Sequence, residues 1–234
     1  MTISIITLFP EVFEPILNSS ILKRAKKKGK VKFELINLRG FGEGKHQVVD
    51  GRPYGGGAGM VLKADILAKA LKSLNLQTNR GPKAQRSARS KIILTSASGK
   101  PYKQKDAKRL SKLDHLIIIC GHYEGVDQRF IDAFVDEEIS IGDFVLTGGE
   151  IPAMAIVDSI VRLIPGVLKK EEATVEESFT DPNLLEYPQY TRPDNFNGQK
   201  VPAVLTSGNH QEVNKWRKQK ALEKTKKIRP DLLD

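Results

Sequence analysis

Short apolar runs alternate with helical patterns along most of this chain, and this alternation constrains the fold more than any other feature. The predicted strands are short runs of mostly apolar residues at positions 2–8, 31–38, 91–95 and 115–120. The predicted helices have apolar residues at helical spacing, at positions 10–19, 20–29, 64–75, 103–112, 126–134 and 151–163. Strands that alternate with helices predict an α/β domain with a mostly parallel sheet.

The length and the end of this pattern predict two domains. A chain of 234 residues is enough for one large domain or two modest ones. The tripeptide Ile164-Pro165-Gly166 ends the alternation, and a charged segment follows it. We therefore expect a first domain at 1–168, a flexible linker at 169–177 and a small helical domain at 178–234. A long basic helical pattern at 209–228 is the main element of the small domain.

Basic residues are clustered along the chain rather than spread evenly. The sequence has 38 Lys or Arg and 28 Asp or Glu, which gives a formal charge of +10 and a pI near 9.6. Basic tracts with at most one acid cover 23–32, 66–105 and 215–229, and the middle tract includes an aperiodic polar segment at 76–90, predicted to be a loop. Such tracts favour a nucleic acid partner, although solvated helix faces are the plainer alternative. They contain few aromatic residues, so base stacking is not the expected binding mode.

Several familiar kinds of site are absent from the sequence. The single cysteine, Cys120, excludes an internal disulfide and a zinc site made of several cysteines. No apolar run is long enough to span a membrane, and no basic start precedes the N-terminal apolar run, so a soluble cytoplasmic protein is expected. No P-loop, Rossmann G-x-G-x-x-G, H-E-x-x-H or G-x-S-x-G motif occurs.

Three loops that contain glycine each follow a predicted strand, and ligands of open α/β sheets gather at the carboxyl ends of strands. The loops cover positions 94–99, 120–127 and 140–150. Their glycines allow the backbone to approach a ligand closely. Leu94, Ile141 and Leu146 could hold a flat heterocycle, and Glu124 could face a cation. Three tight turns are the plainer alternative, and the residues alone leave both interpretations open.

A fourth loop, at 50–60 (DGRPYGGGAGM), has too much glycine to pack as a core element. It is either a mobile lid or a linker. Asp50, Arg52 and Tyr54 at its mouth favour the lid, because a plain linker would not usually combine these side chains.

Six collinear segments resemble the TrmD family of bacterial tRNA (guanine-N1)-methyltransferases, which belong to the SPOUT class. They are 52–60 (RPYGGGAGM), 120–129 (CGHYEGVDQR), 139–150 (ISIGDFVLTGGE), 162–168 (RLIPGVL), 187–193 (YPQYTRP) and 201–208 (VPAVLTSG). The resemblance implies a homodimer, a deep trefoil knot formed by the loops at 94–99, 121–125 and 140–149, and S-adenosylmethionine as methyl donor. It also implies methylation of the guanosine just 3′ of the anticodon. A SPOUT enzyme for another RNA and a non-catalytic RNA-binding relative remain the alternatives.

The resemblance also assigns residues. The predicted donor-binding residues are Leu94, Thr95, Ser96, Gly121, Tyr123, Glu124, Gly125, Ser140, Ile141, Gly142, Asp143, Phe144, Val145, Leu146, Gly148 and Gly149. The predicted RNA-binding residues are Asp50, Arg52, Tyr54, Lys215, Lys218 and Lys220. Magnesium is allowed as an accessory ion, but the sequence has no dedicated ligand cluster. We expect His115 at a strand edge, and His122 in a loop that faces RNA or solvent.

Two residues are predicted to act on the guanine. Guanine N1 carries a proton at neutral pH, so a carboxylate must remove it. The family has an aspartate directly before Ser-Phe, and this chain has Glu177 there, one methylene longer, with Glu176 as a weaker candidate. Without the resemblance, two solvated linker acids would be the plainer interpretation. Arg162, expected after a helix that ends at the site, would contact the guanine and stabilise negative charge on O6.

Overall fold

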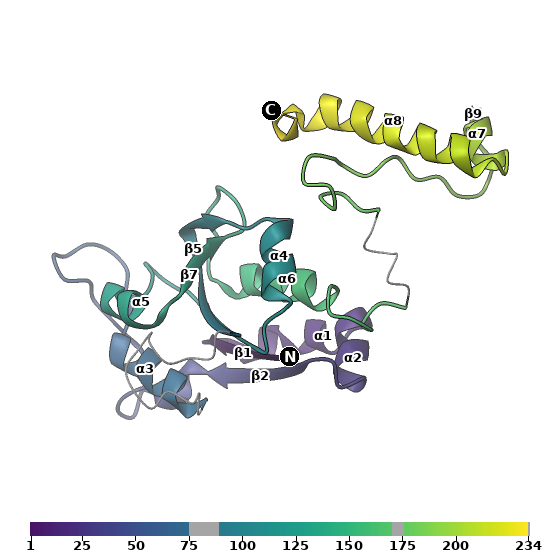
Figure 1. Cartoon of the computed structure of the whole chain (residues 1–234). Coiled ribbons are helices and arrows are strands. Elements are labelled where there is room, and N and C mark those ends of the chain that lie inside the picture. Colours follow the sequence, from purple (N-terminus) through teal and green to yellow (C-terminus); the bar gives the residue numbers. More distant parts are fainter. Residues whose placement is uncertain (75–88, 170–175, 234) are drawn as a thin grey trace. The chain divides into compact units, whose positions relative to one another are not determined.

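The structure of this protein is a computed structural model that describes residues 1–74, 89–169 and 176–233 (Figure 1). The chain divides into two compact units, Met1–Lys169 and Lys170–Asp234. Most of the loop predicted at 76–90 and most of the linker predicted at 169–177 lie outside the described residues.

The first unit is built on a five-stranded sheet whose strand pairs are all parallel. In spatial order the strands are β2 (Lys32–Asn37), β1 (Thr2–Thr7), β6 (His115–Cys120), β5 (Ser90–Pro101) and β7 (Glu137–Ser140). In this register Ile5 of β1 lies between Leu35 and Ile118. Parallel strands need crossover connections, which helices supply here. The predicted α/β class with a mostly parallel sheet is confirmed.

β5 extends further than the strand predicted at 91–95, because it covers twelve residues. Its pairing with β7 is interrupted after Thr95, since Thr95 and Lys100 are both in register with Ile139. Residues 96–99 therefore bulge out of the ladder. The prediction located the break in pairing correctly but ended the extended backbone too early.

Two hydrophobic clusters lie on opposite faces of the sheet. In β6, Leu116 and Ile118 belong to one cluster, and Ile117 and Ile119 belong to the other. Strands buried on both faces are apolar along their whole length, which is why the sequence predicted them. One face is covered by α1 (Glu14–Leu17), α2 (Ser20–Lys27), α4 (Gln104–Leu110) and α6 (Glu150–Val161). The other face is covered by α3 (Ala64–Ser73) and α5 (Gln128–Phe134) (Figure 1).

The single helix predicted at 10–19 is wrong. The segment forms the 3-10 helix η1 (Pro10–Val12) and then the one-turn helix α1. Pro15 lies in the first turn of α1, where its missing N–H costs nothing, but it could not donate inside a longer helix.

The glycine-rich loop is bounded by two short strands. These strands, β3 (Asp50–Gly51) and β4 (Val61–Leu62), pair antiparallel, and the 3-10 helix η2 (Leu38–Phe41) precedes them. The nine residues between the strands have no regular structure, as the sequence predicted.

The second unit is organised around one long helix, α8 (His210–Ile228), whose first turn is capped by the Asn209 side chain. The other elements are the hairpin of β8 (Asn195–Phe196) and β9 (Gln199–Lys200), the short helix α7 (Ala203–Thr206) and the 3-10 helix η4 (Pro230–Leu232). The buried Thr225 hydroxyl accepts a 2.9 Å hydrogen bond from the Leu185 amide, which fastens the preceding segment to α8. The helix predicted at 209–228 is confirmed. Across the described ranges, no helix has the length and apolar character needed to cross a membrane.

Candidate functional site

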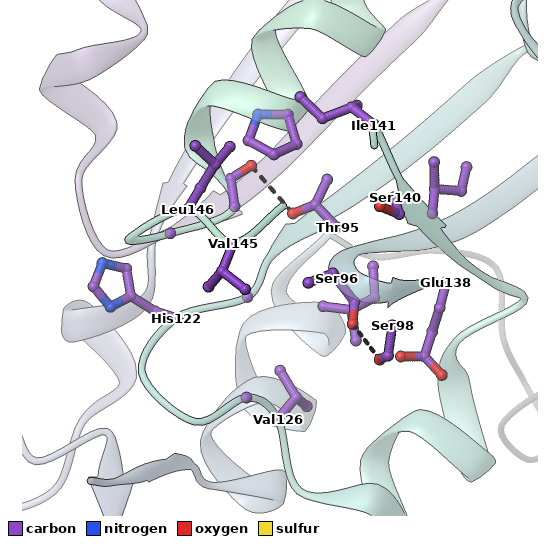
Figure 2. Close-up of a pocket in the computed structure, with 18 of the residues that line it drawn as sticks. Thr95, Ser96, Ser98, His122, Val126, Glu138, Ser140, Ile141, Val145 and Leu146 are labelled. Atoms are coloured by element: carbon purple, nitrogen blue, oxygen red, sulfur yellow. Dashed lines mark hydrogen bonds between the residues drawn. The ribbon is translucent and has the colours of Figure 1, made fainter. Parts of the chain in front are cut away.

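The main pocket of the first unit lies at the carboxyl ends of β5, β6 and β7 and has a volume of about 450 Å³ (Figure 2). It is lined by the three loops at 94–99, 120–127 and 140–150 that the sequence singled out. A cavity of this size is in the range that holds a cofactor or a drug-sized ligand. The three loops therefore form one site and are not independent turns.

Hydrogen bonds interlock the three loops at the base of the pocket. The buried Thr95 hydroxyl lies 3.2 Å from the carbonyl oxygen of Ile119 and 3.1 Å from that of Gly149. The Gly149 amide donates a 2.7 Å hydrogen bond to the carbonyl oxygen of Gly121. Residues far apart in sequence thus fix the backbone that surrounds the cavity.

Two of these positions have no room for a side chain. A Cβ at Gly121 would lie 2.8 Å from the Thr95 carbonyl oxygen, and a Cβ at Gly149 would lie 2.6 Å from the Gly121 nitrogen. Glycine is needed here for close backbone approach, and neither residue requires a left-handed conformation.

The structure brings together all but one of the predicted donor-binding residues. Fifteen of the sixteen line the pocket, and the exception, Asp143, is exposed and points elsewhere in the third loop. Further lining residues, which the sequence did not single out as ligand-binding, include Ser98, His122, Val126, Gln128 and Glu138. Glu138 belongs to β7 itself, and only the register of that strand reveals that it reaches the pocket.

His122 differs from its expected position. It was expected to face RNA or solvent, but it is half-buried and lines the pocket. Its ring packs 5.3 Å from the Phe9 ring and 4.7 Å from the Tyr123 ring, between centroids, and its Nδ1 accepts a hydrogen bond from the Tyr123 amide. His115 begins β6, as expected.

The chemistry of the lining fits a cationic ligand that has an apolar ring system. Leu94, Ile141 and Leu146 provide apolar walls. Ser96, Ser98 and Glu138 group together on another side, where the two hydroxyls are 2.8 Å apart (Figure 2). The only charged residues that line the pocket are the two carboxylates Glu124 and Glu138, in a chain whose net charge is +10.

A buried carboxylate, that of Glu150, lies next to the pocket-lining residue Gly149. Glu150, the first residue of α6, is 7% exposed and accepts a 2.8 Å hydrogen bond from the Thr7 hydroxyl. Burial, and secondarily the charge of Glu150, raise the pKa of the Cys120 thiol well above its usual value.

The glycine-rich loop is fastened to the second pocket loop. The Glu124 amide donates to Met60, the Leu62 amide donates to Gly125, and a Cβ at Gly59 would collide with the Glu124 side chain. At the other end of the loop Tyr54 is 99% exposed. Arg52 is also exposed and Asp50 is half-buried. An attachment to the pocket at one end and exposed side chains at the other favour a lid over a linker.

Arg162 follows α6, as expected, but the pocket lies at the other end of that helix. Gly149 and Pro152, at the start of α6, line the pocket, so the helix begins at the site and does not end there. Arg162 is its C-cap, and a helix of 12 residues separates its two ends by about 18 Å. Glu177 belongs to the second unit, where its carbonyl accepts a 3.1 Å hydrogen bond from Thr180.

The basic residues of α8 differ in how they are paired. Lys215 and Lys218 are exposed, whereas Lys220 forms a 2.6 Å ion pair with Glu223. Arg217 stacks 4.8 Å from the centre of the Tyr187 ring and contacts Glu176 at 3.4 Å. Arg217 therefore holds the segment that precedes α8 in place.

No group of three or more His, Cys, Asp or Glu in the described ranges 1–74, 89–169 and 176–233 could hold a metal ion. The magnesium allowed by the resemblance thus has no preformed ligand set in this part of the chain.

The fold and the pocket define an α/β protein with a small-ligand site at the carboxyl edge of a parallel sheet. The family model described as tRNA (Guanine-1)-methyltransferase TrmD matches residues 1–234, and the chain belongs to that family. Relatives named tRNA (guanine-N(1)-)-methyltransferase include those of Bacillus pumilus, 52% identical over 234 residues, and Dictyoglomus turgidum, 51% identical over 234 residues. These alignments cover 100% of this chain and 92% and 90% of the relatives. The resemblance inferred from the sequence is confirmed.

Proposed function

We propose that this protein is a tRNA (guanine-N1)-methyltransferase that methylates the guanosine just 3′ of the anticodon. The relatives' names supply the activity, and full-length identity of about half supports its transfer to this chain. The observation that carries the proposal is the pocket, in which fifteen of the sixteen predicted donor-binding residues meet.

The proposed donor is S-adenosylmethionine, which when bound supplies an electrophilic methyl group. Leu94, Ile141 and Leu146 would enclose its ring system, and the carboxylates of Glu124 and Glu138 would attract its positive charge. The interlocked loop backbone is rigid, so these groups need little rearrangement on binding.

Proton removal from the guanine is assigned to Glu177. Its carboxylate would accept the N1 proton as the methyl group is transferred, and a positioned base typically contributes about 10²–10⁴-fold. The Arg162 guanidinium would stabilise the negative charge that develops on O6. Both roles rest on the family motif.

A homodimer is part of this proposal. Because α6 separates Arg162 from the pocket of its own chain by about 18 Å, a second copy is needed to bring Arg162 to that pocket. Phe144, Val145 and Ile151 expose apolar surface beside the pocket, at 53%, 86% and 54%, and burying it against a second copy would be favourable.

The proposed architecture follows the same family. The first unit would bind the donor, with a deep trefoil knot in which the third loop passes the second, and the hydrogen bond between Gly149 and Gly121 supports this crossing. The second unit would bind tRNA through the exposed Lys215 and Lys218. Because tRNA is the proposed substrate, the proposed site of action is the cytoplasm.

Methyl transfer to paired transcripts tests the function. Labelled S-adenosylmethionine would be offered with a tRNA that has guanosine 3′ of the anticodon and with one that has adenosine there. We expect label only in the first. Equal labelling would remove the substrate assignment, and labelling of neither transcript would favour a non-catalytic RNA-binding relative.

A further inference from the structure

The basic tract at 23–32 has no part in the site or in the proposed contacts of the second unit. It contains seven Lys or Arg and no Asp or Glu. It forms most of α2, the turn that follows and the start of β2. Leu22 and Ala25 face the core, and all seven basic residues are exposed. The tract is therefore a basic surface attached to a rigid helix.

Four of these residues, Lys23, Arg24, Lys27 and Lys30, form what we name the α2 basic face. None of the four has an ion pair to a carboxylate within the described part of the chain. The carboxylate nearest in sequence after them, Glu34, is paired with Lys32 at 2.7 Å. The α2 basic face thus keeps its full charge, unlike α8, where Lys220 is paired with Glu223.

Helix stability alone does not explain this clustering. The helix dipole favours basic residues in the last turn, which accounts for Arg24 and Lys27. It does not account for Lys23 or Lys30. Like charges four positions apart, such as Lys23 and Lys27, destabilise an isolated helix. A polyanion that neutralised them would remove this repulsion and release counterions.

The α2 basic face lies beside the end of the first unit. Lys28, within the tract, donates a 3.0 Å hydrogen bond to the carbonyl oxygen of Gly166, and α2 packs against α6 in the same core cluster. Arg162, predicted to contact the guanine, caps α6 only four residues before Gly166. An RNA whose target base reaches Arg162 would therefore pass close to α2.

We infer that the α2 basic face is a second RNA-binding surface, which contacts the phosphate backbone of tRNA outside the target nucleotide. The inference rests on the proposed function, because it takes tRNA as the partner. Contacts to phosphates fix the register and orientation of a nucleic acid and carry no sequence information. The α2 basic face would hold the tRNA body while the target base enters the pocket.

The test neutralises three residues of the α2 basic face together, by Lys23→Gln, Arg24→Gln and Lys27→Gln. The matched control, Lys45→Gln, Lys108→Gln and Lys112→Gln, removes the same charge from three exposed lysines of the same unit that lie outside the basic tracts. Filter binding measures the Kd for whole tRNA between about 50 and 200 mM salt. We expect the Kd of the α2 variant for tRNA to rise about tenfold or more. The plot of log K against log salt concentration should become less steep by about 2 to 3, at roughly 0.7–0.9 per lost phosphate contact.

Three further measurements separate this inference from the proposed function. The Kd for S-adenosylmethionine and the rate at saturating tRNA should be unchanged in the α2 variant, and thermal unfolding should show an intact fold. An unchanged Kd and salt slope, or an equal change in the control variant, would overturn the inference and leave the methyltransferase proposal standing. If the wild-type protein methylated no tRNA, the proposed function itself would be overturned.

Discussion

Thr95 and Gly149 lie 54 positions apart in sequence, and a 3.1 Å hydrogen bond joins the Thr95 hydroxyl to the Gly149 carbonyl (Figure 2). The contact links the end of the regular β5 ladder to the residue before α6. It fixes the distance between two of the three loops, and so sets the width of the pocket.

We predict that Gly149→Ala opens the pocket. The new methyl group would collide with the Thr95 hydroxyl and lie 2.6 Å from the Gly121 nitrogen, so the loops must separate. Stability should fall by about 1–3 kcal/mol, as for other overpacked cores, and S-adenosylmethionine should bind roughly tenfold or more weakly. Urea unfolding measures the loss of stability, and titration calorimetry measures the Kd for S-adenosylmethionine. Gly40→Ala is the control, since a Cβ there has nothing within 4 Å; equal losses in the two variants would contradict the prediction.

We predict that Cys120 is unreactive in the native protein. Burial raises the pKa of its thiol well above the usual value, so the thiolate is scarce even at mildly alkaline pH. A disulfide reagent at pH 8.5 should label the thiol only after denaturant is added. Rapid labelling of the folded protein would mean that the buried region around Cys120 opens to solvent.

Acid should destabilise the first unit through His115. Burial lowers the pKa of His115 below 6.5, although the nearby Glu34 carboxylate opposes this. The unfolded chain then binds the proton more readily, so stability is complete above pH 6.5 and is lost as pH falls from 6.5 to the lowered pKa. Urea midpoints at a series of pH values should fall less for His115→Gln than for the wild type. His46→Gln, at an exposed position, is the control and should behave like the wild type.

The pKa of Glu34 is lowered by its hydrogen bonds to Lys32 and Ser4, so its contribution to stability is lost only below pH 4.5. The two effects therefore occupy separate pH windows. A loss of stability confined to pH values below 4.5 would contradict the role of His115.

We predict that Glu177→Gln lowers the rate of methyl transfer by about 10²-fold or more, while the Kd for S-adenosylmethionine is unchanged. The amide is similar in shape but cannot accept the proton. Glu176→Gln is the comparison, because it removes the negative charge that Glu176 presents to Arg217 and the Tyr187 hydroxyl and keeps the predicted base. If Glu176→Gln abolished transfer and Glu177→Gln did not, the base would be assigned to Glu176.

The lysines of α8 should contribute unequally to tRNA binding. Lys215→Gln and Lys218→Gln each remove an exposed charge, whereas Lys220 is already paired with Glu223 at 2.6 Å. We expect each of the first two to lower the salt slope by about 0.7–0.9, and Lys220→Gln to lower it less. Three equal decreases would mean that tRNA displaces Glu223.

The sequence by itself determined four of the five strands of the sheet, most of the helices, the three pocket loops and the family; the fifth strand, β7, was not predicted. Strands such as β6 are apolar along their whole length because both faces are covered, and that pattern is local. Glycines such as Gly121 mark close backbone approach even before their neighbours are known. The exception is the segment at 10–19, where Pro15 divides one expected helix into two short ones.

Only the tertiary structure decided how distant residues combine. The register of β7 places Glu138 in the pocket, and the packing of loops turns His122 toward it, although neither fact has a local signature. The pocket lies at the start of α6 and Arg162 lies at its end. Because a helix of 12 residues is about 18 Å long, Arg162 is distant from the pocket of its own chain. Local patterns fix which elements form, whereas three-dimensional packing fixes which side chains share a site.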